Sequence, residues 1–205
     1  RFGLNTRWMG QKIVSYEETG STNDVAAKLA AQGMSEGTVI FAESQSKGRG
    51  RLGRSWISPK GKSILTSVIF RPKLLPSQAS QITLMSAVAV AKAIEKQTGL
   101  SPQIKWPNDV LIEGKKVSGI LTEMQAETDQ IRFLVVGIGI NVTVPADLLP
   151  GNATSIHLET AYSVQRTAFS GQVKEMISRI QLAQELLRQL ETGYNLLHDE
   201  QWETI

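Results

Sequence analysis

The run FLVVGIGI at residues 133–140 decides how this chain folds, because it is apolar on both faces of an extended strand. A strand of that kind belongs in the middle of a sheet that is covered on both sides. Residues 117–124 before it are also strand-like, and the polar turn at 127–129 separates the two runs. We therefore predict that 117–124 and 131–142 are antiparallel neighbours at the centre of a sheet.

Further strands and helices alternate around this pair. Capping residues STND at 21–24 precede a helix at 25–31, which Gly33 ends. The alanine-rich run at 77–97 carries apolar residues all round and predicts a helix buried on most sides. The fold class is therefore α+β, a mixed, largely antiparallel sheet with helices mainly on one face. The other predicted strands are residues 12–16, 38–42, 63–70 and 104–112, the last interrupted at Pro107.

A long helix is predicted from Gly171 onward, because apolar residues recur there at three- and four-residue steps. Packing of this stripe on the sheet is the favoured interpretation. A partner helix or a coiled coil is the alternative, for which about two and a half heptads give thin support. The stripe consists of Val173, Met176, Ile180, Ala183, Leu187, Leu190, Tyr194 and Leu197.

Composition is that of an ordinary globular domain. The 205 residues fit one domain, residues 1–205, with 41% apolar and 20% charged residues. No apolar run approaches the roughly 20 residues that span a bilayer, and residues 1–10 lack the apolar stretch of a signal peptide. The absence of cysteine excludes disulfides, thiolate metal sites and cysteine nucleophiles. We expect a cytoplasmic protein that does not bind membranes.

Charge is distributed unevenly along the chain. Residues 44–94 hold nine basic residues and no acidic one, whereas the rest of the chain holds 13 basic and 19 acidic residues. Such a region points to an anionic ligand. Near the start of this region is GRGRLGR, residues 48–54. Glycine lets backbone N–H groups approach an anion, and arginine matches carboxylate and phosphate oxygens. A solvated cationic face would explain Lys60, Lys62 and Lys73, but it explains the glycine-spaced arginines poorly.

Three phosphate-binding motifs fail in context. The glycine spacing at 48–53 fits a dinucleotide fingerprint, but residues 55–59, SWISP, break the required helix and 68–74 contain no acid. A kinase glycine loop would need His-Arg-Asp and Asp-Phe-Gly triplets, which this chain lacks. Residues 61–63, GKS, imitate the end of a P-loop, but Trp56 stands where its first glycine is required.

The two histidines offer no nucleophilic or zinc chemistry. His157 is expected in a loop and His198 in the terminal helix, and both are interpreted as surface or structural residues. A substrate with its own ionised carboxylate needs no general base. The protein then has only to align that carboxylate with the α-phosphate of ATP and to neutralise the charge.

Five motifs occur in one order along the chain. They are STN at 21–23, Gln45 with GRGRLGR at 48–54, KWPND at 105–109, KVSG at 116–119 and GIGIN at 137–141. This series resembles that of bacterial biotin protein ligases of the stand-alone type. The resemblance implies a class II synthetase-like catalytic fold. It also implies that biotin and ATP, with Mg²⁺, give biotinyl-5′-AMP, whose biotinyl group passes to a lysine of a biotin carboxyl carrier protein.

The same resemblance implies roles for individual residues. Lys116 matches the family's lysine that bridges the biotin carboxyl and the α-phosphate, and Arg51 is the second expected catalytic residue; Lys115 could exchange roles with Lys116. Asp109 is interpreted either as a Mg²⁺ ligand or as the partner of the nearby lysine, so no metal ligand is assigned. The implied biotin-binding residues are Ser21, Thr22, Asn23, Gln45, Arg49, Gly50, Arg51, Lys116, Gly119 and Gly137. The implied ATP-binding residues are Arg51, Arg54, Trp56, Asn108, Asp109, Lys116 and Asn141.

Two other functions stay open. A lipoate or octanoyl ligase or transferase shares related architecture, but Gln45 and the arginine loop argue against it. A non-enzymatic RNA- or phosphate-binding module would need more stacking aromatics than Trp56 and Phe70. Few residues precede the first motif, so neither a helix-turn-helix nor specific DNA binding is expected. The small C-terminal β-barrel of the family is expected to be absent or truncated, and a homodimer is an open hypothesis.

Overall fold

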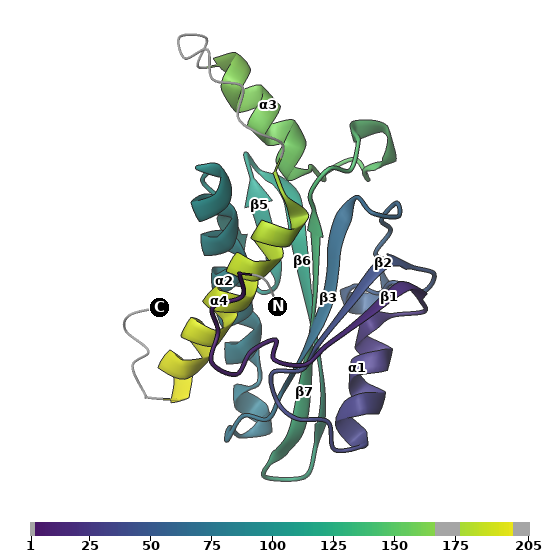
Figure 1. Ribbon diagram of the computed structural model, residues 1–205, viewed down its shortest axis with the longest axis vertical. Helices are drawn as coiled ribbons and strands as arrows, with labels where there is room; N and C mark the ends of the chain where they lie inside the picture. The colour runs from purple at the N-terminus through teal and green to yellow at the C-terminus, as the bar shows by residue number, and fades with distance from the viewer. Residues whose placement is uncertain (1–2, 167–176, 199–205) are drawn as a thin grey trace.

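Seven strands build one sheet at the centre of the molecule (Figure 1). The structure is a computed structural model and describes residues 3–166 and 177–198. Within these residues the strand order is β1-β2-β3-β7-β6-β5-β4, with β1 parallel to β2 and every other pair antiparallel. The strands are β1 Ile13–Thr19, β2 Val39–Gln45, β3 Ser63–Phe70, β4 Gln103–Lys105, β5 Asp109–Ile112, β6 Lys115–Ala126 and β7 Ile131–Asn141.

The predicted central strand is confirmed. β7 lies between β3 and β6, and nearly all of its residues are buried. β6 and β7 form the predicted hairpin, in which Glu127 N donates to Gln130 O at 2.9 Å. The predicted strands at 12–16 and 38–42 are also confirmed, but both run further because the parallel pairing continues to Thr19 and Gln45.

Helices cover the two faces of the sheet unequally (Figure 1). α2, Ser80–Thr98, and α4, Arg179–His198, pack together on one face and bury the larger part of the core there. α1, Thr22–Ala31, lies on the other face and covers Ile69 and Phe133. The predicted α+β class, with a mixed, largely antiparallel sheet and helices mainly on one face, is confirmed.

The terminal helix needs a correction. Ile177 and Ser178 are not helical, so within the described residues α4 begins at Arg179; Val173 and Met176 of the predicted stripe lie outside those residues. Packing of the helix on the protein core is confirmed. Ile180 is nevertheless 71% exposed, because the buried side of α4 is turned toward Leu182 and Leu186.

One helix was not predicted. α3, Ile156–Arg166, projects from one end of the sheet (Figure 1) and contains His157, which was expected in a loop. Both His157 and His198 are exposed, in agreement with a surface role.

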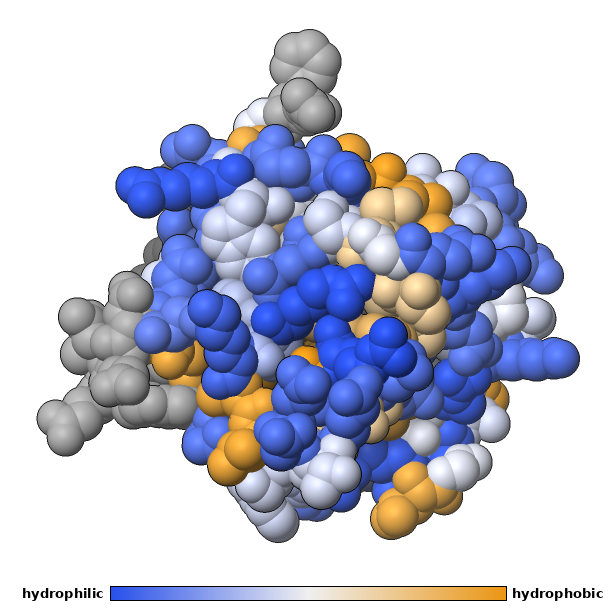
Figure 2. Space-filling view, turned by 90° about the horizontal axis from the view of Figure 1, so that it is seen from below, coloured by the Kyte–Doolittle hydropathy of each residue, from blue (hydrophilic) through white to orange (hydrophobic). Residues whose placement is uncertain are grey.

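The surface of the described residues is mixed in character. Seen from below in Figure 2, hydrophilic residues cover most of the face, and hydrophobic residues form separate patches. Large exposed apolar side chains are scattered over distant elements, including Ile13 and Leu84. In the described part of the chain, no helix combines the length and the apolar character needed to cross a membrane.

Candidate active site

A cavity of about 530 Å³ opens on the sheet face that carries α1. Side chains alternate between the two faces of a strand, so Phe133, Val135, Gly137 and Gly139 of β7 all point to this face. Phe133 and Val135 pack beneath α1, whereas the two glycines beyond them have no side chain of their own and line the cavity. Side chains from other elements can therefore come close to the backbone of β7 here.

Two glycines of β7 allow their neighbours to approach the sheet. A Cβ atom at Gly137 would overlap Asn23 Oδ1, and one at Gly139 would overlap the indole of Trp56. Gly119 of β6, which pairs with Gly139, lies under the same indole. Gly139 was missed in the sequence, although its position two residues after Gly137 places it on the same face.

The start of α1 forms a polar end of the cavity. Ser21, Thr22 and Asn23 are buried, and Gln45 Oε1 accepts hydrogen bonds from Thr22 N at 2.7 Å and Thr22 Oγ1 at 3.0 Å. The Ser67 hydroxyl donates to Asn23 Oδ1 at 2.6 Å. The Ser21 side chain makes no capping hydrogen bond, so the helix-capping alternative is wrong for this residue. Thr22 of the STN motif and Gln45, 23 positions apart in the sequence, are thus brought into direct contact.

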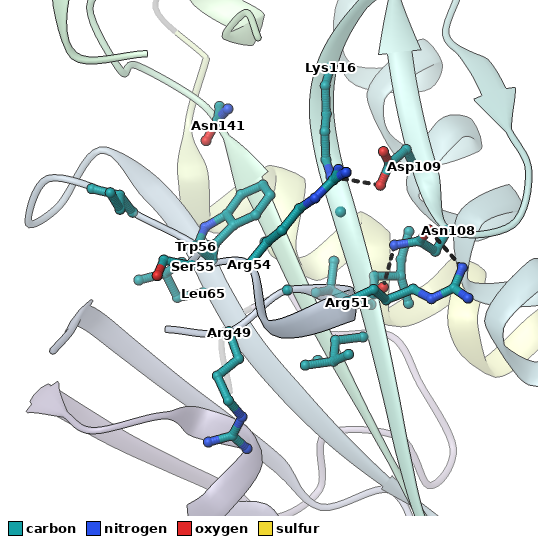
Figure 3. Close-up of a pocket in the computed structure, with 18 of the residues that line it drawn as sticks. Arg49, Arg51, Arg54, Ser55, Trp56, Leu65, Asn108, Asp109, Lys116 and Asn141 are labelled. Atoms are coloured by element: carbon teal, nitrogen blue, oxygen red, sulfur yellow. Dashed lines mark hydrogen bonds and ion pairs between the residues drawn. The ribbon is translucent and has the colours of Figure 1, made fainter. Parts of the chain in front are cut away.

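Arg49 makes ion pairs at the edge of the cavity. Its guanidinium donates to both carboxylate oxygens of Asp24, at 2.8 and 2.7 Å, and contacts Glu123 at 3.2 Å. The hydrogen bonds from Arg49 hold the pKa of Asp24 below its usual range. Figure 3 shows this guanidinium pointing away from Lys116 and Arg54. Its charge is therefore largely matched within the protein.

Glu123 also orients the start of α1. Its Oε2 accepts a hydrogen bond from Asn23 Nδ2 at 2.7 Å, and the same amide donates to Leu121 O at 3.3 Å. Glu123 and Ser67 were both missed. Only the register of β6 and β3 beside β7 brings them to Asn23, and local sequence patterns do not specify that register.

The remainder of the glycine–arginine loop lies across the cavity mouth. Gly50 N donates to Arg54 O at 2.6 Å, which closes a tight turn at Arg51–Gly53. Arg51 donates to Asn108 Oδ1 at 3.3 Å, so the loop is joined to the turn after β4. Arg54 reaches toward Lys116 in Figure 3, and no ion pair of its side chain is found among the described residues. Arg51 and Arg54 line the cavity.

Lys116 occupies the opposite wall. Its Nζ lies 2.7 Å from Asp109 Oδ1, an ion-pair distance without the angles of a hydrogen bond, and 5.7 Å from the Trp56 ring centre. Lys115 points to the other side of the strand, where its Nζ lies 3.3 Å from Glu159. Of the two lysines, Lys116 is therefore the one that faces the cavity.

Three more residues from the implied nucleotide set line this cavity. Asn108 Nδ2 donates to Ile120 O at 3.0 Å, and Asn141 Nδ2 donates to Thr154 O at 3.1 Å. Trp56 Nε1 is buried against the sheet at Gly139 and has no hydrogen-bond partner among the described residues. Every residue of the two implied binding sets thus lines the same cavity.

The fold and the motif residues around this cavity are those of a family of ligase domains, as a match over most of the chain shows. Residues 16–141 match the Biotin/lipoate A/B protein ligase family, and the chain belongs to that family.

Individual relatives agree with this assignment. The chain is 42% identical over 194 residues to the bifunctional ligase/repressor BirA of Bacillus spizizenii, covering 95% of this chain and 57% of that protein. It is 34% identical to a biotin–[acetyl-CoA-carboxylase] ligase of Mycobacterium tuberculosis, covering 87% and 66%. The structure of an Aquifex aeolicus biotin protein ligase in complex with biotin and ATP matches with a TM-score of 0.70 and 29% identity, covering 91% and 71%. The chain thus spans only part of the length of these relatives.

Proposed function

We propose that this chain joins biotin to ATP as biotinyl-5′-AMP and passes the biotinyl group to a lysine of a biotin carboxyl carrier protein. One observation carries the proposal. A single cavity holds uncharged polar groups at the start of α1 and cationic groups at Lys116 and Arg54, and it is also lined by glycines of β6 and β7. Biotin has the same order of groups: a ureido head, an apolar chain and a carboxylate. The ligase relatives and the complex with biotin and ATP support the same conclusion.

The polar end suits the head of biotin. A ureido group needs both donors and acceptors, which hydroxyl and amide side chains supply. We assign this part to the buried α1 residues and the glutamine that they contact, with Gly137 beside Asn23. The proposed head-group residues are Ser21, Thr22, Asn23, Gln45 and Gly137; Gly119, where a Cβ atom would lie 3.1 Å from Lys116 Nζ, is proposed to bind biotin at the carboxylate end.

The chain and carboxylate of biotin are assigned to the segment from Arg49 to Arg51. The Arg49 guanidinium is paired with Asp24 and Glu123, so its contribution comes from the backbone and from the position that it gives the loop. Arg51 and Lys116 are the proposed catalytic residues, because both cations line the part of the cavity where two anions have to meet.

The nucleotide is assigned to the mouth and far wall of the cavity. Mg²⁺ enters with ATP and is held by its phosphates, as is common for Mg²⁺ in nucleotide sites. No cluster of three acidic or histidine residues able to hold a metal occurs in the described segments. The proposed residues are Arg51, Arg54, Trp56, Asn108, Asp109, Lys116 and Asn141.

Two displacements complete the reaction. A carboxylate oxygen of biotin attacks the α-phosphorus of ATP, an O–P bond forms, and the bond to the β-phosphate breaks as pyrophosphate leaves. The amine of the carrier lysine then attacks the acyl carbon, a C–N bond forms, AMP leaves and the nitrogen loses a proton. In the first step Lys116 and the arginines lower the repulsion between the two anions, which is an electrostatic and positioning role.

The remaining features of the proposal concern partners. The carrier is a biotin carboxyl carrier protein, as the acetyl-CoA-carboxylase ligase relatives suggest. We propose a single catalytic domain that works in the cytoplasm and binds DNA without sequence preference.

Calorimetric titration with biotin and with lipoate, each in the presence of ATP, tests the substrate. Biotin is expected to bind and lipoate to give no heat. Tighter binding of lipoate would contradict the proposal and favour the lipoate alternative.

Lys116→Ala tests the chemistry. Loss of the cation that faces the cavity should slow pyrophosphate release by about 100- to 1000-fold, the range found when one electrostatic donor is removed from an active site. Lys96→Ala is a matched control, since Lys96 pairs with Glu185 at 3.0 Å on the opposite sheet face. Normal pyrophosphate release by the Lys116 variant would remove this residue from the mechanism.

A further inference from the structure

Glu159 is a buried carboxylate next to the proposed active site, and none of the five sequence motifs includes it. It lies in α3 and is 1% exposed. Its Oε1 accepts a hydrogen bond from Thr154 Oγ1 at 2.6 Å and pairs with Lys115 Nζ at 3.3 Å. Burial of a carboxylate is costly unless the charge is paired and hydrogen-bonded. The Glu159 side chain is therefore held in place by Thr154 and Lys115.

Thr154 belongs to a short segment that takes the place of β7 beside Lys116. The last pair between β6 and β7 joins Ser118 and Ile140, after which β7 ends. Beyond this point Lys116 N donates to Asn152 O at 3.0 Å, and Thr154 N donates to Lys116 O at 2.8 Å. Both backbone groups of Lys116 are therefore bound by residues 152–154.

All three polar groups of Thr154 are used in this arrangement. Its N–H bonds to Lys116, its carbonyl accepts from Asn141 Nδ2 at 3.1 Å, and its hydroxyl donates to Glu159. Thr154 thus connects Glu159 to two residues of the cavity.

The first residues of β6 make contacts on both faces of the sheet. Successive side chains of a strand point to opposite sides, so Lys115 reaches Glu159 while Lys116 reaches Asp109 in the cavity. Glu159 binds the side chain of Lys115 directly, and it contacts the backbone of Lys116 through Thr154. Any shift of α3 would therefore be transmitted to the residue at which biotin and ATP are proposed to meet.

We propose that Glu159 is a positioning residue, which sets the backbone of Lys116 through Thr154 and Lys115 and so aims the Lys116 ammonium at the reacting carboxylate and phosphate. This inference rests on the proposed function, because it gives Glu159 a role only through Lys116. Reactions that depend on alignment lose rate steeply when a group is displaced by about 1 Å.

Thr154→Val and Thr154→Ser test the connection with little change in volume. Valine removes the hydroxyl, so single-turnover formation of biotinyl-5′-AMP should slow by between about 10- and 100-fold. Serine keeps the hydroxyl and should restore the rate. Biotin affinity, measured by calorimetry without ATP, should change much less than the rate in both, since the head-group end of the cavity is untouched. Glu159→Gln, which keeps the shape but removes the charge, should slow the same step.

Glu185→Gln is the matched control. Glu185 is also fully buried on a helix and pairs with Lys96 at 3.0 Å and Arg188 at 2.7 Å, but on the far side of the sheet. This variant should lower the melting temperature and leave adenylate formation unchanged. If Thr154→Val and Glu159→Gln form the adenylate as fast as the unaltered protein while Lys116→Ala does not, only this inference is overturned. An active Lys116→Ala variant would instead overturn the proposed function.

Discussion

Two halves of one sheet face, built by the same strands, have opposite properties. In the half under α1, Ile69 of β3 pairs with Val135 of β7 and both are buried in apolar contacts. In the other half, Leu65 of β3 pairs with Gly139, against which the Trp56 indole lies, and both residues line the cavity. The backbone is continuous and the register does not change. The difference lies in side-chain volume, so one sheet carries a packed core in one half and the cavity in the other.

Phe133→Ala tests the covered half and should have the largest effect. Phe133 is buried under α1, and removal of a buried phenylalanine costs about 3–5 kcal/mol of unfolding free energy because a cavity remains. Urea unfolding measures this loss. Biotin affinity of the folded protein should be unchanged, since the cavity is in the other half. An equal fall in affinity would show that the two halves are not separate, and Leu148→Ala, at an exposed position, is the control.

Gly137→Ala tests the open half. The added methyl group would overlap Asn23, whose amide is fixed by Glu123 and Ser67. Overpacking costs about 1–3 kcal/mol, which corresponds to biotin binding weakened by about 5- to 150-fold if the strain falls on the site. Calorimetry measures the affinity. Gly20→Ala is the control, because a methyl group there meets no atom within 4 Å. Unchanged binding by the Gly137 variant would contradict a biotin site lined by Gly137.

Local patterns predicted the covered half well. The apolar run of β7, the turn before it and the residues of α1 each lie within a few positions in the sequence, so their structures follow from the nearby residues. The cap was the exception, because α1 begins at Thr22 and Ser21 makes no capping hydrogen bond. The resemblance to biotin protein ligases implied that residues of the five motifs bind the same substrates, and in the structure these residues line one cavity.

Long-range contacts explain what could not be predicted. The Arg49 guanidinium was expected to face the ligand, but it is paired with Asp24 and Glu123. These partners lie 25 and 74 positions away, so the sequence did not reveal the pairing. Lys115 and Lys116 could not be told apart, because the face that each one takes depends on the irregular register between β5 and β6. Glu159 gave no recognisable pattern, since its partner Lys115 lies 44 positions away.

The pair of Asp24 and Arg49 lies at the boundary between the two halves, and we expect its effect on stability to be the smallest. Asp24 is 58% exposed, so Asp24→Asn should cost only about 0.2–1 kcal/mol at pH 7, as exposed ion pairs do.

The hydrogen bonds from Arg49 lower the folded-state pKa of Asp24 from its ordinary value of 3.8. The stabilisation is therefore complete above that value and is lost as the pH falls through the lower folded-state pKa. Urea unfolding from pH 7 down to below the folded-state pKa of Asp24 should show the two proteins converging at the acid end, and high salt should shrink the difference at pH 7. Asp147→Asn, at an exposed aspartate without an ion pair among the described residues, should show no such convergence. A difference that persists at the acid end would mean that the Asp24→Asn substitution disturbs the start of α1 itself, and the boundary would then belong to the covered half.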